Sequence, residues 1–357
     1  MTARFLATAI LAPMTILGVA HAQEPVTVTD QTGAEIVLDG PAERVVTVPM
    51  PAAAMFIAID GSADRLAGMH QQSKAAIAEG ILGDFFPGAL DVPTDMIGTQ
   101  FAPNVEEMLA VNPDLVFQWA NRGADVISPM TDVGLNVIGL TYGSQEEAEE
   151  WMRIMGEVAG EEEKANRLID WHRTTLAELQ STVEEIAKED RPTVLYLGRF
   201  LSELRAPGTG TYQAWAVEAA GGVNPAADLS GWTAVNIEQV LAWNPDVILL
   251  NNFEEGLDPQ DVYDDPQMAG ISAVENRRVY MMPLGGYRWD PPSHESPLSW
   301  HWLAMIIHGD AVDYPIREEI RESYGWIYGQ TPTEEQIDEI LRVDMNGQSA
   351  GYERFEG

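Results

Sequence analysis

The sequence predicts an α/β fold in two lobes, each with a parallel-type sheet flanked by helices, and one long helix that joins them. Short apolar strands alternate with helical segments along the chain, which is typical of parallel sheets. The phrase NVEEMLAVNPDLV at 104–116 returns as NIEQVLAWNPDVI at 236–248, which indicates one related unit in each lobe. Residues 161–190 contain neither Pro nor Gly, and they predict a connecting helix of roughly 40 Å.

The first residues of the chain predict a signal peptide. Arg4 supplies a positive end, residues 5–19 form a short apolar run, and Ala-His-Ala at 20–22 fits the small-residue cleavage rule. The chain has no Cys, which excludes disulfides and attachment through a lipidated cysteine. We therefore expect a soluble exported protein that is retained in a bacterial periplasm.

The length of 357 residues is sufficient for two domains. We place the signal peptide at 1–22 and the N-terminal lobe at 23–160. The connecting helix follows at 161–190, and the C-terminal lobe with an acidic helical tail occupies 191–357.

The N-terminal lobe opens with a β-hairpin at 26–40, because VTVTDQTGAEIVLDG alternates apolar and polar residues on both sides of a turn. Ser144 and Glu147 have the spacing of a capping box and predict the start of a helix that runs to about 159. Between these points we expect strands at 44–48, 65–68, 114–119 and 137–140, and helices at 52–59, 104–111 and 125–133.

The C-terminal lobe begins after Pro192, which ends the connecting helix. The acidic helix predicted at 333–343 is interpreted as solvating surface. We expect strands at 193–198, 246–250 and 278–282, and helices at 212–220, 236–242 and 297–308.

The repeated phrase reads as a helix, a turn and a strand. Each helix ends at Asn-Pro, because Pro disfavours the helical conformation in the residue before it. We expect Leu109 and Leu241 to pack on their own sheets.

Aromatic and Arg side chains follow the predicted strand ends, where ligands bind in open parallel sheets. The chain has 20 Lys and Arg against 56 Asp and Glu, so Arg at these positions is notable. Flat rings and planar guanidinium groups suit a large, partly flat, anionic or oxygen-rich ligand. The predicted ligand-binding residues are Met50, Trp119, Arg122, Tyr142, Arg199, Phe200, Asn252, Phe253, Tyr287, Arg288 and Trp289.

Several other functions find no support in the sequence. A net charge of −36 argues against nucleic-acid binding. His294-Glu295 lacks the second His of a zinc-protease motif, since position 298 is Leu, and the spacing of His294, His301 and His308 indicates helical packing. No Cys nucleophile, G-x-S-x-G or P-loop occurs. We predict no catalytic residue, no metal site and no resident cofactor.

The chain resembles the periplasmic substrate-binding proteins of ABC importers, in the class for iron complexes and vitamin B12. The resemblance is carried by the predicted hairpin, the repeated phrase and the long helix, together with PAERVVTVPM at 41–50 and EAAGGVN at 218–224. The resemblance covers most of the mature chain. It implies a rigid connecting helix, small lobe movements and a monomer that docks on a permease dimer with its ATPase. In similar proteins each lobe presents a surface glutamate to a permease arginine, and the matching residues are Glu106 and Glu238.

The resemblance leaves the ligand open, because the cleft varies among relatives. A ferric-siderophore-type complex matches the Arg and aromatic residues, so we predict capture of such a complex and its delivery to the permease. A corrinoid or haem is the alternative, with Tyr287 or His70 as an axial ligand for haem. A periplasmic hydrolase and a sensor without transport are further alternatives.

Overall fold

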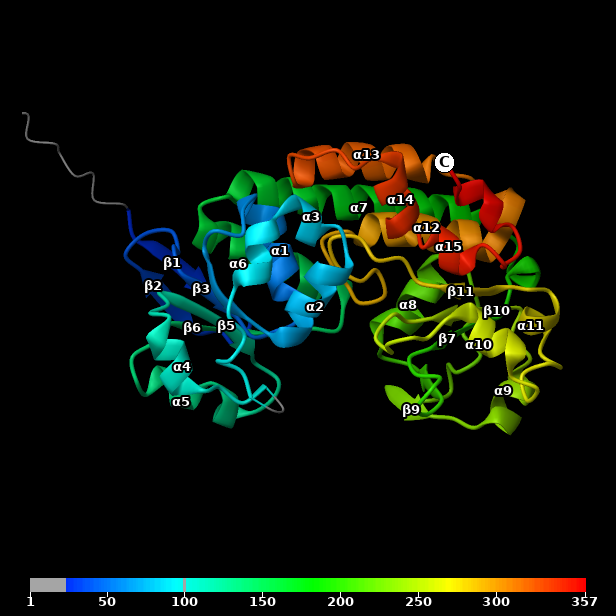
Figure 1. Ribbon diagram of the computed structural model, residues 1–357, viewed down its shortest axis with the longest axis horizontal. Coiled ribbons are helices and arrows are strands. Elements are labelled where there is room, and N and C mark those ends of the chain that lie inside the picture. The colour runs from blue at the N-terminus through cyan, green and yellow to red at the C-terminus, as the bar shows by residue number, and fades with distance from the viewer. Residues whose placement is uncertain (1–23, 99–100) are drawn as a thin grey trace, which may run out of the picture.

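The computed structural model describes residues 24–98 and 101–357, so the predicted signal peptide at 1–22 lies outside the described residues. Two lobes stand side by side, and helices run across both of them along one side of the molecule (Figure 1). The predicted fold class is confirmed.

The N-terminal lobe contains a four-stranded parallel sheet with the strand order β4-β3-β5-β6. Every side chain of these strands is buried, as expected for a parallel sheet covered by helices. The elements are β1 Val26–Thr29, β2 Glu35–Leu38, β3 Val45–Thr47, α1 Ala52–Asp60, β4 Leu66–Met69, α2 Gln71–Glu79, α3 Leu82–Phe85, α4 Val105–Ala110, β5 Leu115–Trp119, α5 Ser128–Thr131, β6 Val137–Leu140 and α6 Gln145–Ala159.

The C-terminal lobe contains a three-stranded parallel sheet with the order β11-β10-β7 and a two-stranded antiparallel ribbon, β8-β9. The predicted strands and helices of this lobe are present, and the ribbon was not predicted. The elements are β7 Val194–Leu197, β8 Arg205–Pro207, α8 Tyr212–Ala219, β9 Trp232–Ala234, α9 Ile237–Trp243, β10 Val247–Leu250, α10 Pro259–Asp264, α11 Ser272–Glu275 and β11 Val279–Met281.

The connecting helix α7 spans Glu162–Glu184 and is shorter than the predicted 161–190. A 3₁₀ turn follows at Lys188–Asp190, and the Arg191 guanidinium folds back to donate a hydrogen bond to the Val183 carbonyl at 2.8 Å. A cation that satisfies a terminal carbonyl is a common way to end a helix. The absence of Pro and Gly before Pro192 therefore marks only the outer limit of this helix.

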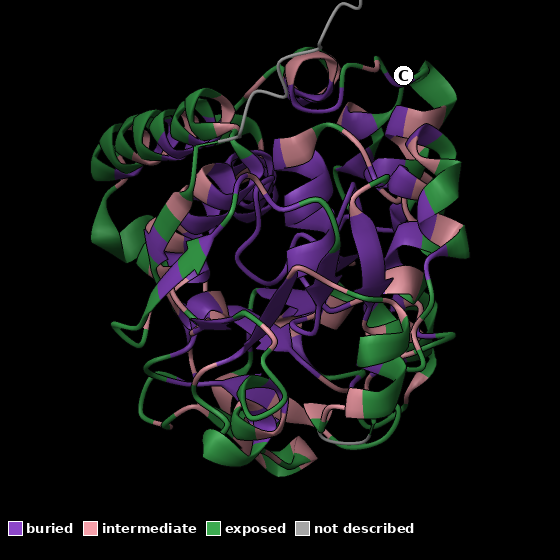
Figure 2. Ribbon diagram, turned by 90° about the vertical axis from the view of Figure 1, so that its left-hand side faces the viewer, coloured by how far each residue is buried: buried purple, intermediate pink, exposed green. Residues whose placement is uncertain are grey.

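The acidic tail is part of the core, so its interpretation as solvating surface is wrong. It forms α14 Glu334–Ile340 and α15 Val343–Asn346, and it follows α12 Ser296–His308 and α13 Ile316–Ile327. The acidic residues of α14 face solvent, whereas Ile337 and Ile340 lie one turn apart and are buried. Figure 2 shows buried residues along the sheets and inner helix faces, with exposed residues on the outer helices.

The repeated phrase forms α4 with β5 in one lobe and α9 with β10 in the other. The prediction that Leu109 and Leu241 pack on their sheets is wrong, because they are 47% and 40% exposed. Met108 and Val240, one position earlier, face the cores instead. These helices are only one to two turns long, so a single inward position is enough to attach each of them.

Candidate ligand-binding site

A cavity of about 650 Å³ lies between the two lobes, beyond the carboxyl ends of the parallel strands. This is the edge of an open α/β sheet at which ligands bind. Seven of the predicted residues line it, and their part in binding stays a prediction. They are Met50, Trp119, Arg122, Tyr142, Arg199, Phe253 and Tyr287.

The wall from the N-terminal lobe is an aromatic cluster built on the ends of β5 and β6. The Trp119 ring lies 6.0 Å from the Tyr142 ring, and the Tyr142 ring lies 4.8 Å from that of Trp151. The Arg122 guanidinium stacks on Phe101 at 4.1 Å and on Trp119 at 5.1 Å. The rings thus hold a cation at the cavity wall, in a chain that has few cations.

The predicted residue Arg288 lies outside this cavity lining and is only 7% exposed. Its guanidinium donates to the Asn252 main-chain and side-chain oxygens and, at 3.1 Å, to Glu79 of α2 in the other lobe. The Asn252 amide in turn donates to the carbonyls of Met282 and Pro283. The Arg288 and Asn252 side chains thus bond to neighbouring loops, and Arg288 also links the two lobes through Glu79.

Two further predicted residues also lie outside the lining. The Trp289 ring is fully buried, and its Nε1 donates to Glu295 at 2.8 Å. Phe200 packs against the core of the C-terminal lobe. The rule that residues after a strand end face the cavity fails at these positions, because the loops turn back onto the lobe.

A buried carboxylate shapes the loop that carries Tyr287. Glu295 accepts hydrogen bonds from the Gly286 N–H at 3.0 Å, from Trp289 Nε1 and from the Tyr328 hydroxyl at 2.5 Å. A Cβ on Gly286 would meet the Tyr328 hydroxyl oxygen at 2.1 Å, so only glycine fits there. Burial raises the pKa of Glu295, and its donors act in the opposite direction. This network fixes the loop against the C-terminal helices.

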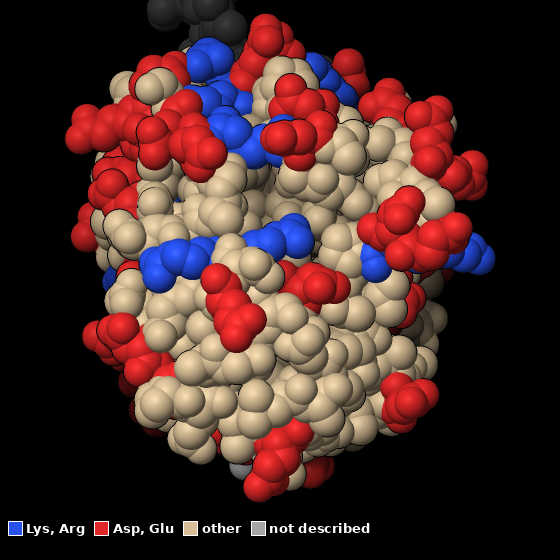
Figure 3. Space-filling view, turned by 90° about the vertical axis from the view of Figure 1, so that its right-hand side faces the viewer, with Lys and Arg blue, Asp and Glu red and all other residues tan. Residues whose placement is uncertain are grey.

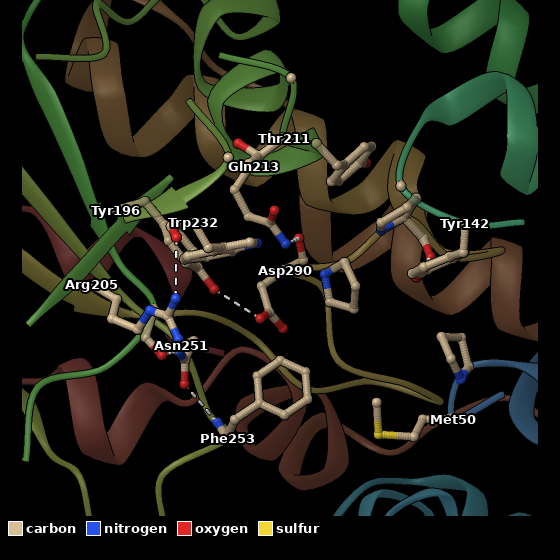
Figure 4. Close-up of a pocket in the computed structure, with 18 of the residues that line it drawn as sticks. Met50, Tyr142, Tyr196, Arg205, Thr211, Gln213, Trp232, Asn251, Phe253 and Asp290 are labelled. Carbon is tan, nitrogen blue, oxygen red and sulfur yellow. Dashed lines mark hydrogen bonds between the residues drawn. The ribbon is translucent and has the colours of Figure 1, made fainter. Parts of the chain in front are cut away.

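The C-terminal lobe contributes lining residues that the sequence reasoning missed. The β8-β9 ribbon supplies Arg205 and Trp232, and the start of α8 supplies further polar groups (Figure 4). The segment GTGTY at 208–212 precedes α8, and its two Gly indicate a sharp chain bend near a surface. The other missed residues include Gln72, Tyr196, Thr211, Tyr212, Gln213, Asn251 and Asp290.

Asp290 has an unusual environment on the cavity wall. Its Oδ2 accepts a hydrogen bond from the Tyr196 hydroxyl at 2.8 Å, whereas its buried Oδ1 has no partner among the described residues. Burial raises the pKa of Asp290 to about 6, although Tyr196 and Arg288 favour the charged form. The carboxylate therefore takes up a proton at a pH closer to neutral than an exposed Asp does.

The histidines near the cavity serve packing. His172 of α7 contacts Gln145 at 2.8 Å and the His294 carbonyl at 3.1 Å, and His294 contacts Tyr328 at 2.6 Å. Burial lowers the pKa of His172 to about 4 and that of His294 to about 3, so both are neutral at pH 7. Within residues 24–98 and 101–357, no group of three or more His, Asp or Glu side chains is arranged to hold a metal ion.

The charged surface is predominantly acidic. Figure 3 shows Asp and Glu spread over the end of the C-terminal lobe, with fewer Lys and Arg between them. No helix in the described part of the chain is both long and apolar enough to span a membrane.

The family model for periplasmic binding proteins matches residues 96–284, which is more than half of the chain. The chain belongs to the periplasmic binding protein family. This family consists of non-catalytic, extracytoplasmic solute-binding proteins. The predictions of the family and of the absence of catalysis are thus confirmed.

Individual relatives agree with this assignment. The chain is 29% identical to a periplasmic solute binding protein from Veillonella parvula, with a TM-score of 0.84 over 91% of this chain and 99% of the other. It is 25% identical to the molybdate-binding protein of Haemophilus influenzae over 60% of this chain and 66% of the relative. It is 27% identical to a cobalamin-binding protein of Halobacterium salinarum over 72% of this chain and 66% of the relative.

Proposed function

We propose that this binding protein is periplasmic, captures a ferric-siderophore-type complex and delivers it to the permease of an ABC importer. The observation that carries the proposal is the cavity of about 650 Å³ between the lobes, lined by aromatic rings and by Arg122, Arg199 and Arg205. Cavities of roughly 300–1,000 Å³ suit organic ligands of moderate size. Arg pairs well with the oxygen atoms of anionic chelators.

The donor groups around the cavity favour a complexed metal over a bare ion. A bare transition-metal ion needs several His, Cys or carboxylate ligands, and Asp290 is the one carboxylate of the described cavity lining. A siderophore supplies the metal ligands itself, so the protein needs only to recognise its outer surface. A single oxyanion such as molybdate would fill a small part of the cavity.

A corrinoid is the second candidate, and the identity to the cobalamin-binding protein over 72% of the chain favours it. Haem has less support. Nδ1 of His70 accepts a hydrogen bond from the Gln72 N–H at 3.1 Å and caps α2, and the His70 ring stacks on Phe101. Tyr287 is buried, and burial raises the pKa of its hydroxyl, which opposes ligation as a phenolate.

Tryptophan fluorescence titration tests the ligand, since Trp119 and Trp232 line the cavity. The panel contains ferric hydroxamate, catecholate and citrate complexes, cobalamin, haem and molybdate, each with its metal-free or apo form. We expect saturable quenching by one ferric class and weaker binding in Arg199→Ala. Arg173→Ala, an exposed position outside the cavity, is the control. Saturation by cobalamin, haem or molybdate alone would overturn the ferric proposal.

We further propose that Glu106 and Glu238 dock the monomeric protein on the two permease subunits of the importer and its ATPase. Both side chains are exposed and take part in no ion pair within the described residues. They lie on α4 and α9, on the side of the lobes away from α7 (Figure 1). Equivalent positions in two lobes suit a partner made of two like subunits. Leu109 and Leu241, one turn further along, add an exposed apolar group to each contact.

A further inference from the structure

Asp290 differs from the other cavity residues that have an unpaired buried polar atom, because it is the one carboxylate of the described lining. The residue is 4% exposed, and it follows the strand β11 on the loop fixed by Glu295. Figure 4 shows its side chain pointing into the space beside Phe253, with one oxygen bonded to Tyr196. Leaving a buried acceptor without a donor costs free energy, so this oxygen favours any group that can donate to it.

Three nearby side chains that could donate are committed to other partners. The Arg288 guanidinium is bound to Asn252 and Glu79, so it does not pair with Asp290. The Tyr142 hydroxyl donates to the Pro292 carbonyl across the lobes. The Tyr212 hydroxyl donates to Ser296 Oγ at 3.1 Å. Among the described residues no donor reaches Asp290 Oδ1, so a donor group of a bound ligand can pair with it from the cavity.

The cavity lining carries charges of both signs. Arg122, Arg199 and Arg205 are its cations, and Asp290 is the one carboxylate of the described lining. A ligand that satisfies both signs has oxygen-rich or anionic groups for the arginines and a hydrogen-bond donor for the carboxylate. A fully anionic complex would place negative charge against Asp290 at a cost.

We propose that Asp290 determines ligand specificity by selecting metal chelates that carry an N–H or O–H donor, most favourably an ammonium group, on the side that enters the cavity. The inference rests on the proposed binding of ferric chelates and specifies their chemistry. An ammonium group supplies charge as well as hydrogen bonds, and charge-assisted hydrogen bonds are the stronger kind.

Two ferric trihydroxamates that differ in one group provide the test. Ferrioxamine B carries a free ammonium group, and its N-acetyl derivative carries a neutral amide instead. Titration of the full mature protein at pH 7.5 by fluorescence or calorimetry gives the ratio of the two dissociation constants. We expect the native protein to bind the ammonium form at least about tenfold more tightly, as one charge-assisted contact predicts.

Asp290→Asn keeps the size of the side chain and an acceptor for Tyr196 while it removes the charge. We expect it to reduce the ratio to about threefold or less, mainly by weakening the ammonium form. Asp310→Asn, at an exposed position outside the cavity, should keep the native ratio. Thermal unfolding of each variant establishes that the fold is intact.

Three results would count against the inference in different ways. Equal binding of the two complexes to the native protein overturns it, as does a native ratio in Asp290→Asn; a trapped water would then be the partner of Oδ1. If neither complex binds while cobalamin, haem or molybdate saturates the protein, the proposed ferric function fails first, and the inference fails with it.

Discussion

The two copies of the repeated phrase occupy different lobes, and comparing them separates the residues that the fold needs from those that it does not. In both copies the first Asn caps its helix, as Asn104 accepts from the Glu107 N–H and Asn236 from the Gln239 N–H. In both copies the later Asn, Asn112 or Asn244, is left-handed, with φ of 45° and 43°. The first position needs a side chain that can cap a helix, and the later position needs a residue that tolerates left-handed backbone.

The final Asp of each copy also has a structural task. Asp114 accepts from the Glu43 N–H at 2.7 Å, and Asp246 accepts from the Thr193 N–H at 2.8 Å. Each carboxylate thus fixes the start of the first parallel strand of its lobe. Within the described residues, neither the Glu nor the Leu of the repeated phrase has a comparable structural partner. A partner that contacts both lobes in the same way would require the same Glu and Leu in both copies, even though the fold does not need them.

The largest effect should follow from reversing both glutamates. In the proposed docking, Glu106→Lys with Glu238→Lys would replace attraction to a basic permease surface by repulsion, and we expect uptake of the ferric complex to fall by at least about tenfold. Ligand affinity should stay within about twofold, since neither residue lines the cavity. Uptake assays in cells and fluorescence titration of the purified protein measure the two quantities.

The neighbouring positions give a matched control for this reversal. Glu107→Lys with Gln239→Lys adds positive charge one residue further along each helix and should leave uptake nearly unchanged. Equal loss in both double variants would show that general surface charge matters and would remove the special role of Glu106 and Glu238.

The next effect contrasts two adjacent positions of α4. Met108 is fully buried, so Met108→Ala should lower the free energy of unfolding by about 2–5 kcal/mol. Leu109→Ala should change it by less than about 0.5 kcal/mol, because the side chain already faces solvent. Urea unfolding measures both values. A large cost at Leu109 would mean that this leucine serves the fold rather than a partner.

A further effect should appear between pH 6.5 and 4, and it arises from His172 and His294. His172 and His294 have pKa values lowered by burial to about 4 and about 3, from an ordinary value of 6.5. The unfolded chain therefore binds protons in this range while the folded chain does not. Above about pH 6.5 the two histidines do not reduce the free energy of unfolding. Below that pH it falls by up to about 1.4 kcal/mol per pH unit for each His.

Asp290 acts in the opposite direction, because its pKa is raised from 3.8 to about 6 and the folded chain holds its proton longer. His70 and His308, whose pKa values burial also lowers, act with His172 and His294, whereas Asp60 and Glu295, whose pKa values burial raises, act with Asp290. Thermal unfolding between pH 7 and 4 measures the slope, and His172→Gln should flatten it. A slope unchanged in that variant would assign the acid sensitivity to other groups.

The smallest effect distinguishes the two left-handed asparagines. The Asn244 side chain exchanges two hydrogen bonds of 2.8 Å with Ser272, whereas the Asn112 side chain makes none within the described residues. Asn112→Gly should be nearly neutral because glycine accepts this backbone, while Asn244→Gly should cost about 1 kcal/mol. Differential calorimetry of the two variants tests this, and equal costs would show that the Ser272 contacts contribute little.

Some of the candidate site could be predicted from the order of elements alone. Parallel strands bring their carboxyl ends to one edge, and this rule placed Trp119, Arg122 and Tyr142 at the cavity. It failed for Arg288, whose side chain turns away to bind Asn252 and Glu79. A rule about loop position says nothing about the direction in which a side chain leaves the loop.

The sequence by itself determined the alternation of strands and helices, the family and the repeated unit, because these follow from local periodicity and short motifs. Only the tertiary structure decided which side chains were buried. On α4 the buried side chain is Met108 and not Leu109, and on the acidic helix α14 it is the stripe of Ile337 and Ile340. It also placed Tyr196 and Asp290 together, although they lie far apart in the chain. Burial and hydrogen-bond pairing depend on contacts between distant segments, and these contacts exist only once both lobes are assembled.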